Sequence, residues 1–322
     1  MAHELTIRED GFVEMAFVGE TPWHELGQSI DENSSIEDWQ KAAGMDWEIK
    51  SAPVHYEVVD NNEHHNLETF NNQNVLYRSD TNAPLSVVTN RYKAVQPKEV
   101  LEFFRDLVDE SGFRIHTAGT LKGGKHLWAL AETGKYGEIT KGDGVGGFLL
   151  LSTSCDKSLA TTARFTTVRV VCNNTLTSAV SDRSHCVSLS HVSVFDHEVV
   201  KAKLGTAVQS FGAFLEMGKY LQKQKLDIFQ AHEFVLELIK PVNQVKAEDS
   251  TNNRTYRKIM QLFDGEAKGF ELAGWTKWGM LNAVTEYYDH HAPSRSNDAR
   301  LDNAWFGMGN SMKDRAVALL TA

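Results

Sequence analysis

The sequence predicts an α+β fold in which a central antiparallel sheet is packed by helices. Three observations predict it: the central third alternates in the manner of β-strands, short polar or glycine-containing turns join those strands, and the last third carries apolar residues at helical spacing. With 322 residues, 41% of them hydrophobic and only 6 Pro, the chain can bury a sizeable core, as one large domain or as closely joined units.

Residues 1–112 form the first predicted unit, an acidic α+β region. Ser35 and Asp38 have the spacing of a capping box, which predicts a helix that Gly44 ends. Pro97 then marks the start of a helix over 98–111. Between these helices we predict short strands over 54–59, 74–78 and 84–88, separated by Asn- and Asp-rich turns.

Residues 113–225 form the second predicted unit, a strand-rich core with a following helix. We predict strands over 115–121, 125–132, 146–154 and 160–171. The glycine-containing segments 122–125 and 141–147 lack the spacing of a phosphate-binding loop, so they are interpreted as hairpin turns. The small polar residues of 172–180 are typical of a helix start, which gives a β-β-β-α core.

Residues 226–322 form the third predicted unit, a helical region that makes one compact body with the core. Apolar residues at i, i+3 and i+4 spacing favour the helix over 195–225 that leads into it. The predicted helices that follow the strands span 195–225, 232–238, 254–263, 276–290 and 311–320.

Charge is unevenly distributed along the chain. The net charge is −10, but residues 1–112 hold 22 acidic and 8 basic side chains, whereas residues 113–225 hold 8 acidic and 14 basic ones. Residues 226–322 are close to balanced, at −2. This asymmetry indicates that the centre and the N-terminal region face different partners.

We expect a cytoplasmic protein that does not enter a membrane. No apolar stretch approaches the roughly 20 residues that span a bilayer, and the first seven residues lack the basic and apolar segments of a secretory signal. The three cysteines are odd in number and form no CxxC pair, which favours a reducing compartment over a disulfide framework or a zinc module.

The candidate binding residues are the cations of the central unit. They are Lys122, Lys125, Lys157, Arg164, Arg169, Lys201 and Lys203. On a strand, Arg164 shares its face with Thr162 and Thr166, a cation flanked by hydroxyls that suits phosphate oxygens. The alternative is a solvated sheet face whose charges protect an edge.

Two other groups of residues suggest chemistry less strongly. Asn173 and Asn174, at the predicted strand-to-helix junction, would cap the helix and leave its backbone N–H groups to hold an anion. Glu286, Asp289 and His290 lie on one predicted helix at spacings that metal ligands use, but the order of the HExxH zinc pattern is absent. We expect no metal and no cofactor, and we expect the aromatic residues of 275–278 and 305–306 to serve the core rather than stack on bases.

Four segments resemble a known family of phage and plasmid proteins. These are residues 20–27, 90–96, 164–176 (RFTTVRVVCNNTL) and 278–289. The family is catalogued as a domain of unknown function, number nine-three-two, so the resemblance implies a genomic context rather than a chemistry.

A more distant resemblance concerns the predicted β-β-β-α core with cations on its strands. It is similar to the core of single-strand annealing proteins of the Red beta, RecT and Erf type. That resemblance implies a non-enzymatic protein that binds single-stranded DNA and anneals it without ATP during recombination, as a homo-oligomeric ring or filament. It also implies a host single-strand binding protein or a nuclease as a partner.

The acidic N-terminal region supports an alternative function. A protein whose acidic surface imitates nucleic acid would inhibit a host defence or repair complex. The sequence leaves both functions open.

Overall fold

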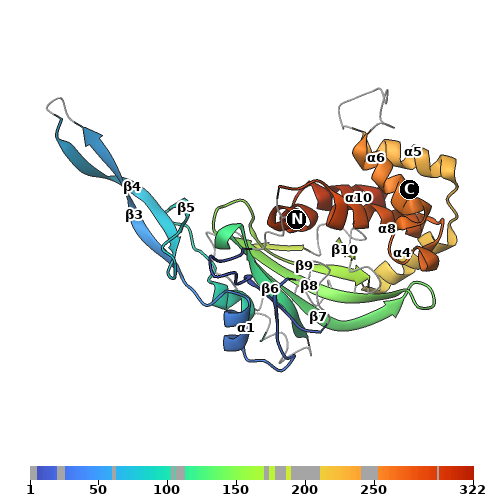
Figure 1. Cartoon of the computed structure of the whole chain (residues 1–322), viewed down its shortest axis with the longest axis horizontal. Coiled ribbons are helices and arrows are strands. Elements are labelled where there is room, and N and C mark those ends of the chain that lie inside the picture. Colours follow the sequence, from blue (N-terminus) through green and yellow to red (C-terminus); the bar gives the residue numbers. More distant parts are fainter. Residues whose placement is uncertain are drawn as a thin grey trace.

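The computed structural model describes residues 6–19, 26–59, 63–102, 105, 113–169, 174–177, 186–189, 211–240, 253–295 and 297–322. Two sheets and a group of C-terminal helices make up the molecule (Figure 1). The predicted α+β class, with antiparallel sheets and C-terminal helices, is confirmed.

The larger sheet has the strand order β10-β9-β8-β7-β6-β1-β2, and β11 also pairs with β9. Every pair in it is antiparallel except β1 with β2. β8 is buried along its whole length, as expected of a strand at the centre of a covered sheet. The strands are β1 (Met15–Phe17), β2 (Gln28–Ser29), β6 (Arg114–Leu121), β7 (His126–Glu138), β8 (Gly144–Ser154), β9 (Thr161–Arg169), β10 (Asn174–Thr177) and β11 (Cys186–Leu189).

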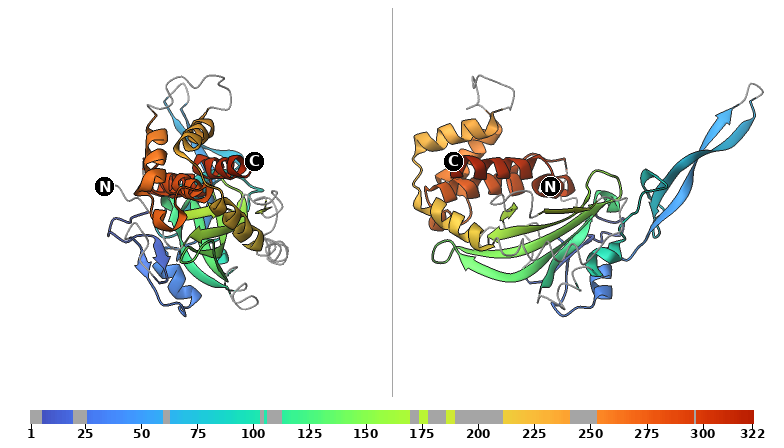
Figure 2. Two further views of the ribbon diagram at one scale, coloured as in Figure 1. Left: turned by 90° about the vertical axis from the view of Figure 1, so that its right-hand side faces the viewer. Right: turned by 180° about the vertical axis from the view of Figure 1, so that it is seen from behind.

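The C-terminal helices lie above this sheet and at one of its ends (Figures 1 and 2). Among the described residues, no helix is long and apolar enough to cross a membrane. Two π turns, η4 (Leu262–Glu266) and η5 (Tyr287–His291), continue α6 and α8. The helices are α4 (Phe211–Lys223), α5 (Ile228–Ile239), α6 (Arg254–Gln261), α7 (Phe270–Ala273), α8 (Lys277–Glu286), α9 (Asn297–Trp305) and α10 (Met308–Thr321).

Alternate side chains of β8 enter two apolar clusters, because successive residues of a strand point to opposite faces. Leu149 and Leu151 belong to a large cluster that includes residues of α4 and α8. Leu150 belongs to a smaller one with Trp128 of β7 and Trp305 of α9, whose rings pack edge to face with centroids 4.9 Å apart. The sheet is therefore covered on both faces.

The second sheet is an arm that projects from the body at the end away from the helices (Figures 1 and 2). It consists of β3 (Ile49–Val59), β4 (His65–Arg78) and β5 (Pro84–Thr89) in the order β3-β4-β5. β5 pairs only with the part of β4 nearest the body, Gln73–Tyr77. The outer part of the arm is therefore a two-stranded ribbon.

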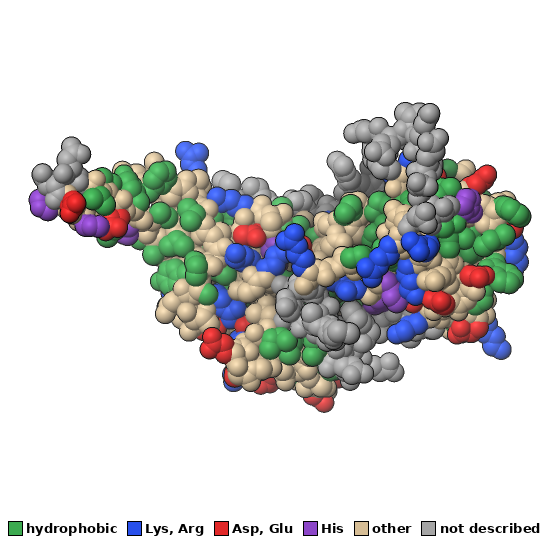
Figure 3. All heavy atoms as spheres, turned by 45° about the horizontal axis from the view of Figure 1, so that its top comes forward, with side chains coloured by type: hydrophobic (Ala, Val, Ile, Leu, Met, Phe, Trp, Pro, Cys, Tyr) green, Lys and Arg blue, Asp and Glu red, His purple; other side chains and the backbone are tan. Residues whose placement is uncertain are grey.

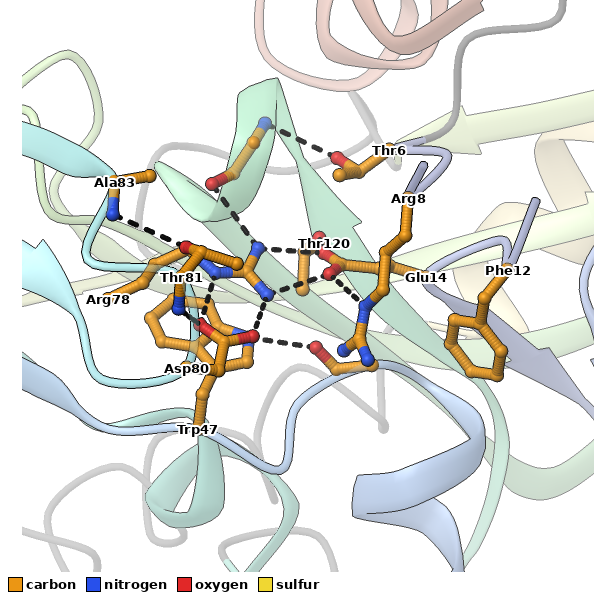
Figure 4. Close-up of polar contacts among 12 residues, drawn as sticks. Thr6, Arg8, Phe12, Glu14, Trp47, Arg78, Asp80, Thr81, Ala83 and Thr120 are labelled. Atoms are coloured by element: carbon orange, nitrogen blue, oxygen red, sulfur yellow. Dashed lines mark hydrogen bonds and ion pairs between the residues drawn. The ribbon is translucent and has the colours of Figure 1, made fainter. Parts of the chain in front are cut away.

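A buried charge network joins the arm to the body (Figure 4). Arg78, the last residue of β4, donates two hydrogen bonds to the Glu14 carboxylate, at 2.7 and 3.0 Å, and two to Asp80, at 2.7 and 3.0 Å. Its guanidinium lies 4.2 Å from the ring centroid of Trp47, in cation–π geometry. Glu14 is fully buried and also accepts hydrogen bonds from Arg8 and from Thr120 of β6.

This network shifts the pKa values of Arg78 and Asp80. Burial alone would lower the pKa of Arg78, but the hydrogen bonds and charges of Asp80 and Glu14 raise it above its ordinary value. Burial would likewise raise the pKa of Asp80, and the hydrogen bonds from Arg78 lower it instead. Arg78 and Asp80 thus each favour the ionised form that the other stabilises.

Most predicted elements are present with shifted ends. The helix after Ser35 is α1 (Ile36–Ala42), and Ser35 and Asp38 form the expected capping box. β4 begins nine residues before the predicted strand at 74, and β7 continues six residues beyond the predicted end at 132. β1 and β2 of the N-terminal region join the larger sheet.

One prediction was wrong. The stretch 172–180 was expected to begin a helix, but Asn174–Thr177 form β10, antiparallel to β9. The backbone groups there pair with the exposed edge of β9, and such tertiary pairing outweighs the capping preference of Asn and Thr.

We predict that Glu14→Gln destabilises the protein by about 3–5 kcal/mol, the typical cost of removing one partner from a buried ion pair. Arg78 and Arg8 would then face a neutral amide. The free energy of unfolding is measured by urea titration. The control is Asp46→Asn, because Asp46 is an exposed partner of Arg8 at 3.4 Å and should cost about 1 kcal/mol or less. Equal effects of the two substitutions would contradict the role given to Glu14.

Candidate nucleic-acid interface

Three of the predicted lysines meet at the end of the sheet nearest the arm. Lys122 and Lys125 lie at the 3-10 turn η1 (Lys122–Gly124) between β6 and β7, and Lys157 lies in the β8–β9 loop. The Cys155 N–H donates to the Lys125 carbonyl at 2.9 Å, which holds the two connections together. Lys157 donates to the Val87 carbonyl of β5, also at 2.9 Å.

A buried histidine fastens these connections to α9. His126 Nδ1 lies 2.7 Å from Asp302 of α9, and its Nε2 lies 2.5 Å from Ser158 Oγ in the β8–β9 loop. Lys122 reaches the other oxygen of Asp302 at 2.9 Å. The order Ser–His–Asp is that of a hydrolytic triad, but Ser158 donates its hydroxyl proton to Asp156. The hydroxyl is therefore engaged as a donor to a carboxylate, and the cluster serves to hold the two loops on α9.

The carboxylates of this cluster favour their ionised form. Burial would raise the pKa of Asp302, but the hydrogen bonds and charges of His126 and Lys122 lower it. Burial would raise that of Asp156 as well, and its hydrogen bonds with Ser158 lower it. Lys122 is thus neutralised locally by Asp302 and contributes mainly to the position of the turn.

Arg164 lies under the C-terminal helices rather than on an open sheet face. Its partner in the sheet is Leu150 of the smaller apolar cluster, and Thr162 and Thr166, which share its face, are buried. On α10, burial raises the pKa of Asp314 against the opposing charges of Arg164 and Lys313. Arg164 is half-buried, and the expected face of one cation between two hydroxyls is covered.

Arg169 has a structural position, which corrects its prediction as a binding residue. Its side chain is buried, and its Nε donates to the buried Asp143 at 2.5 Å. Its terminal nitrogens donate to the carbonyls of Lys268 and Gly269. Asp143 also accepts a hydrogen bond from Trp278 Nε1 at 2.9 Å. Arg169 therefore joins the sheet to the C-terminal helices and is not accessible to a phosphate.

The remaining predicted residues are not tested by the geometry. Asn173, Lys201 and Lys203 lie outside the described residues. Asn174 is the first residue of β10, where its sheet partner is Arg169.

A basic pocket that the sequence did not indicate lies between α6 and η5. It has a volume of about 440 Å³, and none of its described lining residues is acidic. The π turn η5 forms one of its walls. A π turn displaces the residues that follow it, and such turns recur at functional sites. The lining residues are Arg254, Arg257, Lys258, Gln261, Tyr287 and His291.

A signal for this pocket was present in the sequence. Arg254, Arg257 and Lys258 have i, i+3 and i+4 spacing, which places three cations on one side of a helix. Arg254 and Arg257 are exposed, whereas Lys258 also pairs with Glu266 at 2.7 Å. The partner wall from η5 lies about thirty residues further along the chain, so the sequence alone did not reveal the pocket.

Contacts between neighbouring elements connect the pocket with the lysines at the sheet end. Lys122 pairs with Asp302 on α9, and Arg300 of α9 donates to the His290 carbonyl in η5, next to His291 of the pocket. Figure 3 shows one face of the molecule, and Lys and Arg side chains form a discontinuous band across its middle, with His beside them. The elements that these contacts link carry Lys125, Lys157, Arg300 and the pocket cations Arg254, Arg257 and Lys258, which together we call the basic band.

The candidate metal ligands are engaged by other groups. Glu286 accepts a hydrogen bond from the Lys268 N–H at 2.9 Å, and Asp289 accepts one from the buried Lys313 at 2.7 Å. Burial lowers the pKa of His290. In the part of the chain that the structure describes, no group of three or more His, Cys, Asp or Glu side chains is placed to hold a metal ion.

The aromatic residues divide between the core and the surface. Trp278 and Trp305 are buried, as predicted for core residues. Trp275, at 57% exposure, is on the surface.

Comparison with known proteins gives one match. A family model described as a domain of unknown function, DUF932, matches residues 84–305, which run from the first residue of β5 to the last of α9. No curated protein matches the chain, and no solved structure does.

We predict that Asp302→Asn destabilises the protein at neutral pH and that this loss shrinks in acid. A carboxyl group whose pKa is lower in the folded state than in the unfolded state stabilises the folded state. This contribution is complete at pH values above the ordinary pKa of the group, 3.8. It disappears as the pH falls through the pKa of the folded state. The difference in free energy of unfolding between wild type and D302N should therefore be constant from about pH 6 to 5 and decline below about pH 4.

Urea titrations across this pH range measure the difference. Asp264→Asn, at an exposed position in η4, is the matched control and should show no such decline. A D302N difference that persists undiminished in acid would contradict the ion pairing described for Asp302.

Proposed function

Because the chain belongs to the DUF932 family, a domain of unknown function, we propose its function from its surface: it binds single-stranded DNA through the phosphate backbone and anneals complementary strands without ATP. The observation that carries this proposal is the basic pocket of α6 and η5, lined by Arg254, Arg257, Lys258 and His291. In this proposal the protein acts in the cytoplasm of a bacterial host, in phage or plasmid recombination.

The composition of the pocket favours phosphate over other ligands. Arginine presents a planar set of donors that matches phosphate oxygens, and two exposed arginines stand one helical turn apart here. Its one aromatic lining residue, Tyr287, is buried, and the Tyr287 hydroxyl is 2.7 Å from Thr255 Oγ1. Base stacking, which needs an accessible ring, is therefore not the basis of binding at this pocket.

Phosphate contacts alone also suit annealing. A strand held by its backbone keeps its base edges free of the protein, because phosphate contacts fix position without reading sequence. Those edges are then available to a complementary strand.

The arm is poorly suited to reading duplex DNA by insertion into a groove. Proteins that read duplex DNA place a helix or a two-stranded ribbon in the major groove. The projecting ribbon of this protein contains no Lys or Arg between residues 51 and 77, and it carries Glu57, Glu63 and Glu68. Phosphates on both sides of a groove would repel it.

We predict that the protein binds a fluorescent oligothymidine with strongly salt-dependent affinity. Each phosphate neutralised on a single strand contributes about 0.7 to the slope of log affinity against log salt. The double variant Arg254→Ala/Arg257→Ala should therefore bind more weakly at low salt and lower the slope by about 1.4. Fluorescence anisotropy at several salt concentrations measures both quantities.

Lys141→Ala is the matched control, because Lys141 is exposed in the β7–β8 turn, outside the basic band, and should leave affinity and slope unchanged. Annealing is followed by energy transfer between two labelled complementary strands without nucleotide. No binding at low salt would refute the proposal and favour the alternative, an acidic surface that engages a host protein. An unchanged slope in the double variant would exclude the pocket as the site.

A further inference from the structure

Arg300 of α9 is a half-buried cation that has no carboxylate partner among the described residues. Its Nη1 donates a hydrogen bond to the His290 carbonyl of η5, whereas its Nε is buried and has no hydrogen-bond partner in the described chain. Burial lowers the pKa of Arg300 below its ordinary value, and no carboxylate in the part of the chain that the structure describes raises it again. The guanidinium has thus lost part of its hydration without gaining a counter-ion.

Two other buried arginines of this protein do have carboxylate partners. Arg78 lies 2.7 Å from Glu14, and Arg169 donates to Asp143 at 2.5 Å. A buried charge is stable where opposite charge and hydrogen bonds surround it, so these two arginines are satisfied within the chain. Arg300 is not, and an unsatisfied buried group of this kind points to a missing ion or ligand.

Arg164 resembles Arg300 in one respect, because its Nε is also buried without a hydrogen-bond partner in the described chain. Its charge, however, acts on the carboxyl group of Asp314 on α10 and lowers the pKa of that group against the effect of burial. Arg164 therefore faces a negative group of the protein itself, and Arg300 is the cation left to an external anion.

The guanidinium of Arg300 lies beside the basic pocket. The carbonyl that it contacts belongs to His290, and the next residue, His291, lines the pocket. Asp302, two residues further along α9, holds this helix to the body through its ion pair with Lys122 at 2.9 Å. The side chain is thus positioned by both α9 and η5 before any ligand binds. A group positioned in advance loses little freedom on binding.

Phosphate is the anion that fits this position. A guanidinium presents planar donors that match the oxygens of a phosphate in pairs. The adjoining pocket contains Arg254 and Arg257 and has no acidic residue in its described lining. A strand that places one phosphate in the pocket therefore meets further positive charge at Arg300.

We propose that Arg300 binds a phosphate of the strand that occupies the basic pocket, next to the phosphate held by Arg254 and Arg257. This contact rests on the proposed function and adds a binding residue outside the pocket. It also gives the strand a path, from α6 past η5 to α9. Through Asp302 and Lys122, α9 in turn contacts the lysine-bearing turn η1.

The salt dependence of oligothymidine binding tests the contact. Arg300→Gln removes the charge and should lower the slope of log affinity against log salt by about 0.7, the contribution of one phosphate on a single strand. Arg300→Lys keeps the charge and should keep most of the slope, but it should bind more weakly because an ammonium group lacks the planar fork. The triple variant Arg254→Ala/Arg257→Ala/Arg300→Gln should lose about 0.7 more than the double variant.

Thermal stability separates a binding role from a structural one. Because Arg300 has no counter-ion in the described chain, Arg300→Gln should leave the melting temperature of the free protein unchanged or raise it. In excess oligothymidine the wild type should gain more in melting temperature than the variant, since the tighter ligand stabilises the folded state more.

Arg315→Gln is the matched control for stability. Arg315 of α10 is also half-buried and donates to the carbonyls of Lys240 and Glu237. Unlike Arg300, it has a carboxylate neighbour, because its Nη2 lies 3.7 Å from Glu237 Oε1. The substitution should lower the melting temperature of the free protein and leave the salt slope unchanged.

Several outcomes would overturn the contact at Arg300. An unchanged slope in Arg300→Gln excludes it, and a fall in melting temperature as large as that of Arg315→Gln assigns the residue a structural role. If inorganic phosphate alone stabilises wild type more than Arg300→Gln, and the slope does not change, the residue binds a free anion and not a strand. Displacement of labelled oligothymidine by polyglutamate as readily as by unlabelled oligothymidine of equal charge would show that carboxylates suffice.

Failure of this contact and failure of the proposed function give different results. Wild type that binds no oligothymidine at low salt refutes the proposed function. Wild type that binds, with a slope that falls in Arg254→Ala/Arg257→Ala but not in Arg300→Gln, retains the proposed function and refutes only the contact at Arg300.

Discussion

The Glu14 carboxylate is fully buried, and the position of the arm depends on it. It accepts hydrogen bonds from Arg78 at the end of β4 and from Thr120 of β6, so one side chain joins the two sheets. A charge removed from water is stable only where its hydrogen-bonding capacity is filled.

The residues around this network are closely packed. Gly44 has a φ of +64°, and a Cβ there would lie 2.5 Å from Glu14 Cγ. A Cβ at Gly124 would lie 2.7 Å from the Trp47 ring. Both positions therefore require glycine.

Other contacts at the base of the arm support this junction, because Ile49, Leu76 and Val88 of its strands belong to the large apolar cluster of the body. Gln96 bonds both the N–H and the carbonyl of Ile49 at the start of β3, and Ser86 of β5 donates to the Cys155 carbonyl. These hydrogen bonds orient the arm base, and the ion pairs of Arg78 fix it against β1 and β6. A ribbon anchored at one end by buried hydrogen bonds and by apolar packing projects in a defined direction. The same loop that carries Cys155 continues to Lys157, so the arm base and one end of the basic band share a support.

The sequence predicted the elements whose pattern is local and missed those that depend on distant residues. Alternation identified β6, β8 and β9, and the Ser35 cap identified α1, because these signals lie within a few residues. The predicted strand for β4 was too short. Its outer half is largely polar and covers no core, so it lacks the alternation of apolar and polar residues that marks a half-buried strand. Arg164 and Arg169 were correctly placed on a strand, but strand parity does not reveal that α10 and the segment around Lys268 cover them about a hundred or more residues later. The basic pocket was missed for the same reason: its walls, α6 and η5, meet only in the folded chain.

Net charge is a poor guide to the partners of this protein. The N-terminal region holds 22 acidic side chains against 8 basic ones, yet Glu14 and Asp80 pair with Arg78, and Asp38 completes the capping box of α1. The acidic surface that remains unpaired includes the arm, where Glu63 and Glu68 stand far from the cations of α6. At the opposite end, exposed Lys223 and Lys225 stand among Glu216, Asp227 and Glu233, so that end is mixed in charge. The cations of α6 instead gather at one pocket, where Arg254 and Arg257 are exposed and none of the described lining residues is acidic. A protein with an overall charge of −10 can in this way present a local basic site to an anionic ligand, because charge acts through its distribution on the surface and not through its sum.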